Sequence, residues 1–262
     1  MEFTVKNLSF GYNKKNTIEN INFDLKDGEI LTILGPNGVG KTTLLKCVLT
    51  FLEYQGEVLI DNVSIKEIEQ KKLWEMVSYV PQAREVNVSY LVEEMILMGR
   101  GIGLSLFQMP TEHDYKVVDD IMKELQIEFL KGKYCNQISG GELQMVLVAR
   151  ALVSTPKILI LDEPETNLDS FNQMKVLEAI SKCAQEGIIC IFNTHYPTHA
   201  LQISDKSLMI SYDNSYVYGE SKVIINEINL EKTFNVKSKI LTTEEDGHTY
   251  YSIINIERNN KI

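Results

Sequence analysis

Residues 35–42 constrain the fold of this chain most, because they follow the pattern GxxxxGK[ST]. The apolar residues 30–34 before them predict a short buried strand, and residues 43–49 after them predict a helix. A glycine-rich loop between a strand and a helix turns backbone N–H groups and the helix dipole toward an anion. Lys41 would add a positive charge, and the Thr42 hydroxyl a ligand for Mg²⁺. We therefore predict that the phosphates of a nucleotide bind here, at Gly35, Pro36, Asn37, Gly38, Val39, Gly40, Lys41, Thr42 and Thr43.

Composition narrows the class of protein. The 262 residues are enough for one large domain or two lobes, each with a real core. No apolar run is long enough to span a membrane and the N-terminus lacks a signal-peptide pattern, so we expect a cytosolic chain. The net charge of −10, from 36 acidic and 26 basic residues, disfavours a nucleic-acid partner. Cys47, Cys135, Cys183 and Cys190 lack paired metal spacing and are expected to be buried thiols.

The order of predicted elements indicates an α/β protein. Residues 2–10 and 17–25 alternate like the strands of a hairpin, with Tyr12 at the mouth of its turn. After residue 206 the chain predicts short strands, turns and a small helix near 227–235. Between these parts, strands are predicted at 56–61, 77–80, 157–162 and 188–192, and helices at 64–76, 90–98, 112–130, 138–153 and 170–186. This alternation predicts a mainly parallel sheet covered by helices.

Polar side chains follow several of these predicted strands. They are Lys41, Gln82, Asp162, Glu163 and His195. Because ligand groups gather at the carboxyl ends of parallel strands, we expect all five on one rim of the sheet. A lone histidine or a pair of acids at a strand end is usually structural, so the assignment depends on the whole series.

Together these motifs resemble the ATP-binding subunits of ABC transporters. The resemblance covers nearly all of residues 1–200 and includes the phosphate loop, Gln82, Ser139-Gly140-Gly141, Asp162-Glu163, Asp169 and His195, in the family's order. It implies the ABC ATPase fold, with a phosphate-loop core, a mainly parallel sheet, an N-terminal antiparallel β subdomain and a helical insertion. We expect residues 1–82 and 156–262 to form the nucleotide-binding lobe of a single domain and residues 83–155 the helical subdomain.

The resemblance also implies roles for the rim residues, with ATP and Mg²⁺ as cofactors. Thr42, Gln82 and Asp162 would hold Mg²⁺, and Glu163 would be the base that polarises the attacking water. His195 would contact the γ-phosphate and keep the water in line. Tyr12 is similar to the family's aromatic residue that stacks on adenine; the alternative is a hairpin aromatic that packs on the sheet.

Ser139, Gly140 and Gly141 form a second small-residue helix start, which predicts a second phosphate site, and the resemblance implies that a dimer uses it. In the family, two chains pack head to tail, so that the signature segment of one closes over the ATP of the other. The residues that would act across this interface are Ser139, Gly140, Gly141, Glu142 and Asp169, and a homodimer is expected. Leu143 and Met145 stand where arginines are common, which puts in doubt any salt bridge from that helix. Glu165 separately occupies a position usually filled by threonine.

The implied partner is an integral membrane permease at the cytoplasmic face of the membrane. We expect residues 83–110, with the apolar face of Leu91, Met95 and Met98, to form a groove for a permease helix. The alternative is that these side chains pack within the insertion.

The cargo is predicted from segments that resemble one branch of the family. Residues 92–100, 139–152 and 194–201 are similar to ATPases that import iron–siderophore complexes, haem or cobalamin with a solute-binding protein. The alternatives are an exporter ATPase, a soluble ABC-type ATPase in DNA or cofactor-assembly work, and a regulator without turnover. The presence of Glu163 and His195 opposes the regulator, and the lack of sustained heptads opposes a DNA-repair ATPase.

Overall fold

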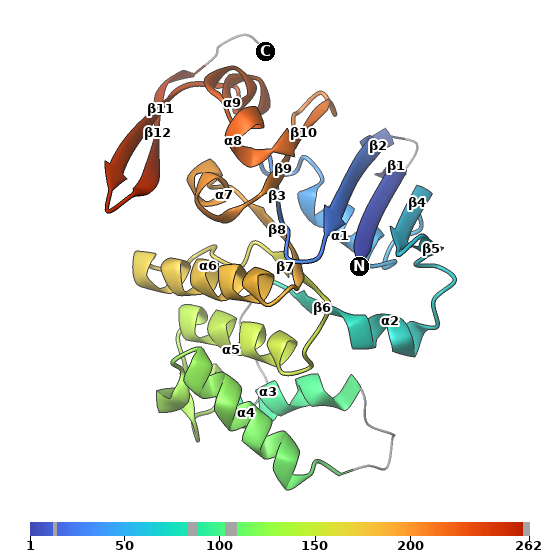
Figure 1. Cartoon of the computed structure of the whole chain (residues 1–262), viewed down its shortest axis with the longest axis vertical. Helices are drawn as coiled ribbons and strands as arrows, with labels where there is room; N and C mark the ends of the chain where they lie inside the picture. The colour runs from blue at the N-terminus through green and yellow to red at the C-terminus, as the bar shows by residue number, and fades with distance from the viewer. Residues whose placement is uncertain (13–14, 83–88, 103–108, 259–262) are drawn as a thin grey trace. The chain divides into compact units, whose positions relative to one another are not determined.

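The computed structural model describes residues 1–12, 15–82, 89–102 and 109–258 (Figure 1). The chain divides into two compact units, residues 1–67 with 191–262 and residues 68–190. This division is not the one expected from the sequence, and the assignment of residues 83–155 to a separate helical subdomain stays a prediction.

The first unit begins with an antiparallel sheet (blue in Figure 1). Strand β1 (Glu2–Tyr12) pairs with β2 (Lys15–Lys26) on one side and with β4 (Gln55–Ile60) on the other, and the short β5 (Val63–Ser64) pairs with β4. Apolar side chains alternate along β1 and face the core, as the period of a half-buried strand requires. The hairpin predicted from the sequence is confirmed, with both strands slightly longer than expected.

A mainly parallel sheet carries the phosphate loop in the same unit. Its order is β10 (Tyr216–Glu220), β9 (Lys206–Ile210), β3 (Ile30–Leu34) and β8 (Ile189–Thr194), with β10 antiparallel to β9. All residues of β3 are buried, in keeping with a strand covered on both faces. Helix α1 (Lys41–Val48) begins directly after the loop.

The end of the first unit contains the helices α7 (Pro197–Ile203), α8 (Ser221–Ile224) and α9 (Glu227–Phe234) and a two-stranded sheet. This sheet consists of β11 (Val236–Glu245) and β12 (His248–Arg258), drawn in red in Figure 1. Ile240, Tyr251 and Ile253 pack from its inner face against a core that includes Leu34 and Leu230. The short strands predicted after residue 206 are confirmed for β9 and β10, and the small helix near 227–235 is confirmed as α9, but β11 and β12 are longer than expected.

In the second unit, β6 (Val77–Val80) pairs in parallel with β7 (Ile158–Asp162). The helices of this unit are α2 (Gln70–Met76), α3 (Val92–Leu97), α4 (Glu112–Glu124), α5 (Gly140–Leu152) and α6 (Ser170–Gln185), with short 3₁₀ turns at Met98–Ile102, Glu128–Leu130 and Cys135–Gln137. Helix α5 packs against α3, α4 and α6.

The helix predicted over residues 64–76 begins only at Gln70. The chain before it is occupied by β5, where Val63 pairs with Ile60 and extends the antiparallel sheet. Strand pairing therefore takes only Ser64 from the predicted helix, and residues 65–68 form turns and a bend before α2 begins.

Two further expectations concern the four cysteines, predicted to be buried thiols, and the absence of a membrane-spanning segment. All four cysteines are buried and free, and burial raises the pKa of the Cys47 and Cys183 thiols to about 12. Within the described ranges, none of the helices is both long and apolar enough to cross a membrane.

Candidate nucleotide-binding and catalytic site

The glycines of the phosphate loop are required by close packing. A Cβ atom on Gly35 would lie 2.6 Å from the Ile210 carbonyl oxygen at the end of β9. At Gly40, whose φ is 107°, it would lie 3.0 Å from the Cγ2 atoms of both Thr17 and Ile18 in β2. Neither position accepts a larger residue without a shift of its neighbours, so the loop is held between β9 and β2.

Lys41 lies inside this loop and is only 4% exposed. Its Nζ donates to the carbonyl oxygens of Gly35, at 2.8 Å, and Pro36, at 3.2 Å. These contacts offset part of the desolvation of a buried ammonium group. The cation is therefore held where the loop backbone would meet a phosphate.

His195 follows β8, and its Nδ1 lies 3.2 Å from Lys41 Nζ. An ammonium group can only donate, so Nδ1 must be the acceptor in this contact. A neutral imidazole in this arrangement carries its proton on Nε2, which is then a donor for a phosphate oxygen. The structure thus brings together two residues that are 154 positions apart in the sequence.

The outer part of the loop is more open. Asn37 and Gly38 are exposed, Thr42 and Thr43 are half-buried, and Val39 is buried. Tyr12 is 53% exposed at the end of β1, and its ring meets that of Phe10 edge to face at 4.8 Å. Tyr12 therefore packs on the hairpin and also has an open side, so its stacking on adenine stays a prediction.

Asp162 ends β7 and is 7% exposed. Tyr79, in the neighbouring strand β6, donates from its hydroxyl to Asp162 Oδ2 at 3.2 Å. The sequence analysis did not identify Tyr79 as a site residue. The alternation of a strand indicates which face of the sheet a side chain lies on, but not which residue of the next strand it contacts. Gln82 is half-buried three residues after Tyr79.

Glu163 has a left-handed backbone, with a φ of 48°. For a residue with a Cβ this conformation costs on the order of 1–2 kcal/mol. The turn takes Glu163 out of the line of β7, and Thr166 Oγ1 lies 3.5 Å from its Oε2. Strained residues of this kind are concentrated at functional sites, which makes Glu163 a strong candidate for the chemistry. Glu165, by contrast, is fully buried, and Gln173 donates to its carbonyl oxygen.

The signature segment forms the start of α5. Ser139 caps the helix: its Oγ accepts from Glu142 N at 3.2 Å, and Glu142 Oε2 accepts from Ser139 N at 2.7 Å. Ser139 and Gly140 are exposed, and a Cβ atom on Gly140 would meet nothing within 4 Å. Leu143 and Met145, which replace arginines, are buried in the core of the second unit.

Asp169 lies beside this segment. It caps α6 by accepting from Asn172 N at 2.8 Å, and Asn172 Nδ2 also donates to its Oδ2 at 3.2 Å. The same Nδ2 atom is 3.2 Å from where a Cβ atom on Gly141 would be. Asn172 is thus hydrogen-bonded to Asp169 and lies beside Gly141. Its position three residues after Asp169 was the available signal for it.

The predicted rim combines residues of both units. Lys41 and His195 belong to the first unit, and Gln82, Asp162 and Glu163 to the second. Their assembly into one rim stays a prediction. Among the described residues, no group of three or more His, Cys, Asp or Glu side chains could hold a metal ion by itself. A Mg²⁺ site in which nucleotide phosphates supply the other ligands needs no such group.

The expected permease groove is only partly described, because residues 83–88 and 103–108 lie outside the described ranges. Met95 is buried, and its Sδ lies 3.7 Å from Arg150 Nη1 of α5, which fits packing within the unit. Leu91 is half-buried and Met98 is 45% exposed. Of the three apolar side chains expected to form the groove, Met98 is therefore the most exposed, and its contact with a permease stays a prediction.

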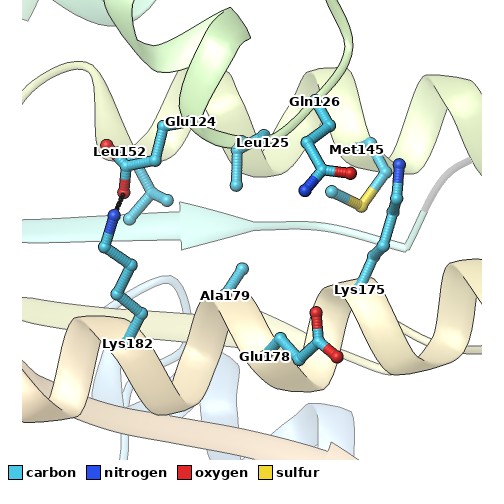
Figure 2. A pocket seen from close by; sticks show the side chains of 9 residues that line it. All are labelled: Glu124, Leu125, Gln126, Met145, Leu152, Lys175, Glu178, Ala179 and Lys182. Atoms are coloured by element: carbon cyan, nitrogen blue, oxygen red, sulfur yellow. Dashed lines mark ion pairs between the residues drawn. The ribbon is translucent and has the colours of Figure 1, made fainter.

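Figure 2 shows a separate pocket in the second unit, which contains none of the predicted site residues. It is a cavity of about 140 Å³ between α6 and the ends of α4 and α5. Its floor is apolar, and Lys182 closes one end through an ion pair with Glu124 at 2.8 Å. Lys175 lies at its opposite end.

Comparison with known proteins identifies the family. Residues 18–166 match the family model described as ABC transporter. A Helicobacter pylori protein named "Probable iron chelatin transport ATP-binding protein" is 36% identical over 80% of this chain and 86% of its own length. A molybdate import ATP-binding protein of Haemophilus influenzae is 33% identical over 89% of this chain and 88% of its own.

The structural comparison agrees. A solved structure described as "An inward-facing conformation of a putative metal-chelate type ABC transporter" is 31% identical, covers 97% of both chains and has a TM-score of 0.85. This chain belongs to the ABC transporter family. It is an ATP-binding and ATP-hydrolysing subunit with the ABC ATPase fold.

Proposed function

We propose that this subunit powers the import of a metal-containing cargo, and more narrowly of an iron chelate such as a siderophore complex or haem, or of cobalamin. The similarity of the whole chain to the ATP-binding chain of a metal-chelate type transporter carries this proposal. The molybdate importer among the relatives extends the range of metal-containing cargo that must be tested.

The proposed chemistry divides between the two units. The loop from Gly35 to Thr43 holds the phosphates, with Lys41 balancing the charge of the β- and γ-phosphates and His195 donating from Nε2 to the γ-phosphate. Glu163 accepts the proton of the attacking water, so that the oxygen attacks the γ-phosphorus as the bond to ADP breaks. Tyr12 stacks on the adenine.

The residues proposed for Mg²⁺ fit its chemistry. Thr42, Gln82 and Asp162 offer a hydroxyl, an amide oxygen and a carboxylate, and Mg²⁺ prefers oxygen ligands. When bound, the ion would neutralise charge that develops on the phosphates. Tyr79 supports this role, because its hydrogen bond orients the buried Asp162 carboxylate.

We propose that the working unit is a head-to-tail homodimer. Ser139, Gly140, Gly141 and Glu142, with Asp169, would close over the ATP held by the partner copy. The exposed start of α5 supports this proposal, because Ser139 and Gly140 are accessible to a phosphate from outside the unit. The dimer would sit at the cytoplasmic face of the membrane through a permease, and a solute-binding protein would deliver the cargo.

Glu163→Gln tests the mechanism. The amide keeps the shape of the side chain but cannot act as a base, so turnover should fall by about 10²- to 10⁴-fold. ATP should still bind and the closed dimer should accumulate, which size-exclusion chromatography with ATP would detect. A variant that binds ATP and stays monomeric would count against the dimer, whereas one that hydrolyses normally would count against Glu163 as the base.

Uptake measurements test the cargo. Cells that carry Glu163→Gln should lose uptake of one of four labelled solutes: a ferric siderophore, haem, cobalamin or molybdate. Loss of the ferric siderophore or haem supports the iron assignment. Loss of molybdate alone would contradict it while leaving the metal-containing cargo in place, and normal uptake of all four would contradict both.

A further inference from the structure

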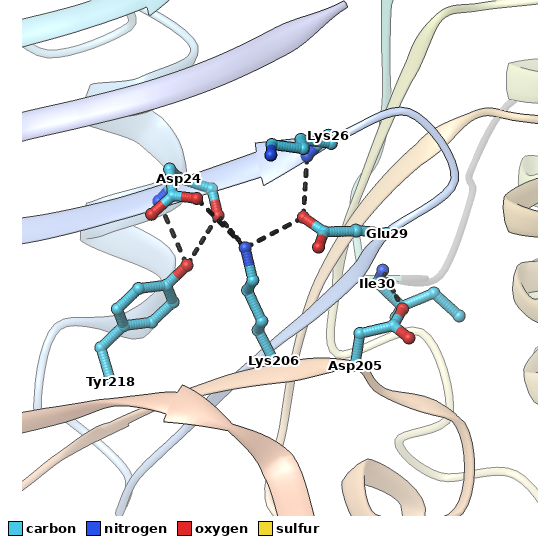
Figure 3. A network of polar contacts seen from close by, with 7 residues as sticks. All are labelled: Asp24, Lys26, Glu29, Ile30, Asp205, Lys206 and Tyr218. Carbon is cyan, nitrogen blue, oxygen red and sulfur yellow. Dashed lines mark hydrogen bonds and ion pairs between the residues drawn. The ribbon is translucent and has the colours of Figure 1, made fainter.

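Strand β2 forms one wall of the phosphate loop and is hydrogen-bonded to side chains of β9 and β10 further along. At its beginning, Thr17 and Ile18 lie against Gly40, as the 3.0 Å distances to a Cβ atom there indicate. Further along, the strand is held by three side chains from β9 and β10, which we call the β2 clamp: Lys206, Tyr216 and Tyr218 (Figure 3 shows two of them).

The two tyrosines of the clamp bind the backbone of β2. Tyr216 donates to the Asn20 carbonyl oxygen at 2.9 Å, and Tyr218 to the Asp24 carbonyl oxygen at 2.6 Å. Tyr218 Oη also accepts from Asp24 N at 3.2 Å. Burial raises the pKa of Tyr218, so its hydroxyl stays protonated and remains a donor at neutral pH.

Lys206 adds an ionic contact at the end of β2 nearest β3. Its Nζ contacts the Asp24 carbonyl oxygen at 3.0 Å, Asp24 Oδ2 at 3.1 Å and Glu29 Oε2 at 3.1 Å (Figure 3). Burial acts to lower the pKa of Lys206, but the hydrogen bonds to Glu29 and Asp24 outweigh it, and the net pKa is raised. The lysine is therefore charged at any physiological pH.

The strand that carries Lys206 reaches the other side of the phosphate loop. At its far end, the Ile210 carbonyl oxygen lies 2.6 Å from the place of a Cβ atom on Gly35. Strand β9 thus forms one wall of the loop, β2 forms the other, and the β2 clamp joins these two walls. A change in the clamp would alter the spacing of the walls and, with it, the convergence of the loop N–H groups.

We propose that Lys206, Tyr216 and Tyr218 are positioning residues for nucleotide binding, which set the affinity for ATP by holding Thr17 and Ile18 against Gly40. This inference rests on the ATPase function of the chain. The clamp does not touch the reacting atoms, so it should affect the binding of ATP more than the rate of its hydrolysis.

The test uses Tyr216→Phe with Tyr218→Phe, which remove two hydroxyls and keep both rings, and separately Lys206→Met. We expect the KM for ATP and the Kd of a fluorescent ATP analogue to rise about tenfold, with kcat within about twofold of wild type. Lys206→Arg should restore part of the affinity. As a matched control, Lys239→Met breaks the exposed ion pair with Glu227 in the same unit and should leave both constants unchanged.

A double-mutant cycle with Thr17→Ser, which removes the methyl group against Gly40, separates positioning from general stability. If the clamp acts through Thr17, the combined rise in Kd should be smaller than the product of the separate rises. Independent effects, or an unchanged Kd in folded clamp variants, would overturn the inference. A wild-type chain that binds no ATP would overturn the clamp and the proposed function together.

Discussion

Helices α1 and α5 both begin at glycines that could meet a phosphate, but their starts differ. Helix α1 begins after Gly40, which has a left-handed backbone and no side chain to cap the helix. Helix α5 begins after Ser139, which forms a capping box with Glu142. The first start has no side-chain cap and begins with the buried Lys41, whereas the second satisfies part of its own N–H groups with a capping box and is open to solvent.

This difference indicates how the starts of α1 and α5 should each contribute to the binding and hydrolysis of ATP. A helix start without a side-chain cap can turn its backbone N–H groups and the positive end of its dipole toward an anion. A capped start uses part of its N–H groups itself, and can add only a further contact to a phosphate that is already held elsewhere. We therefore expect α1 to control binding of ATP, and α5 to affect turnover in the dimer.

The largest effect should come from Lys41→Ala. Removing the ammonium group leaves the phosphates without their charge partner, so affinity for ATP should fall by about 10²-fold and turnover by more. Titration with a fluorescent nucleotide and a phosphate-release assay measure the two effects. Lys46→Ala, an exposed lysine on the same helix, is the control and should behave as wild type.

Gly140→Asp should distinguish the role of the α5 start in turnover from the role of the α1 start in ATP binding. The carboxylate fits, because a Cβ atom there meets nothing within 4 Å, and an acid in the first turn should stabilise α5 slightly. It would repel the partner's ATP, so turnover should fall by about 10²-fold while the Kd for ATP of the single chain stays unchanged. A variant with normal turnover would break the comparison, because α5 would then have no contact with phosphate.

Asn172→Ala should have a smaller effect on the same interface. The change removes the hydrogen bond that joins Asn172 to the Asp169 carboxylate beside Gly141. Turnover should fall by about fivefold, because the Asp169 carboxylate at the proposed dimer interface loses this hydrogen bond. Gln185→Ala, at the exposed end of the same helix, is the control; equal activities in the two variants would exclude a role for the bridge.

The smallest effect on activity is expected at a third helix start, that of α4. Asp114 accepts from the Thr111 backbone at 2.8 Å, the Thr111 hydroxyl at 2.7 Å and Arg100 Nε at 2.9 Å. These contacts lower the pKa of Asp114 to about 2. Because the folded pKa lies below the unfolded value of about 3.9, this carboxylate stabilises the fold above about pH 4 and loses that effect as the pH falls toward 2.

Asp114→Asn should therefore leave turnover unchanged and lower the unfolding midpoint at pH 7. The difference from wild type should shrink between about pH 4 and pH 2, as thermal unfolding followed by circular dichroism would record. A difference that stays constant over this range would mean that the charge of Asp114 does not contribute to stability.

The sequence was most informative where local chemistry fixes the structure. The helix that begins near Ser139 and the strands before Lys41 and Asp162 were predicted from spacing and residue type alone. The contacts of Tyr79 with Asp162 and of Asn172 with Asp169 and Gly141 could not be predicted, because they depend on which elements become neighbours. The β2 clamp is of the same kind: Tyr218 and Asp24 are 194 residues apart in the sequence.

The left-handed backbone conformation of Glu163 has a consequence for how this position evolves. Glu163 carries a Cβ atom in a backbone conformation that glycine adopts freely, so its proposed role as the base sets turnover against stability. Where selection for ATP hydrolysis is lost, a Glu163→Gly substitution would be accepted and would relieve the backbone strain at this position. Homologues that have lost ATPase activity should therefore have glycine at the position of Glu163 more often than random mutation alone would produce.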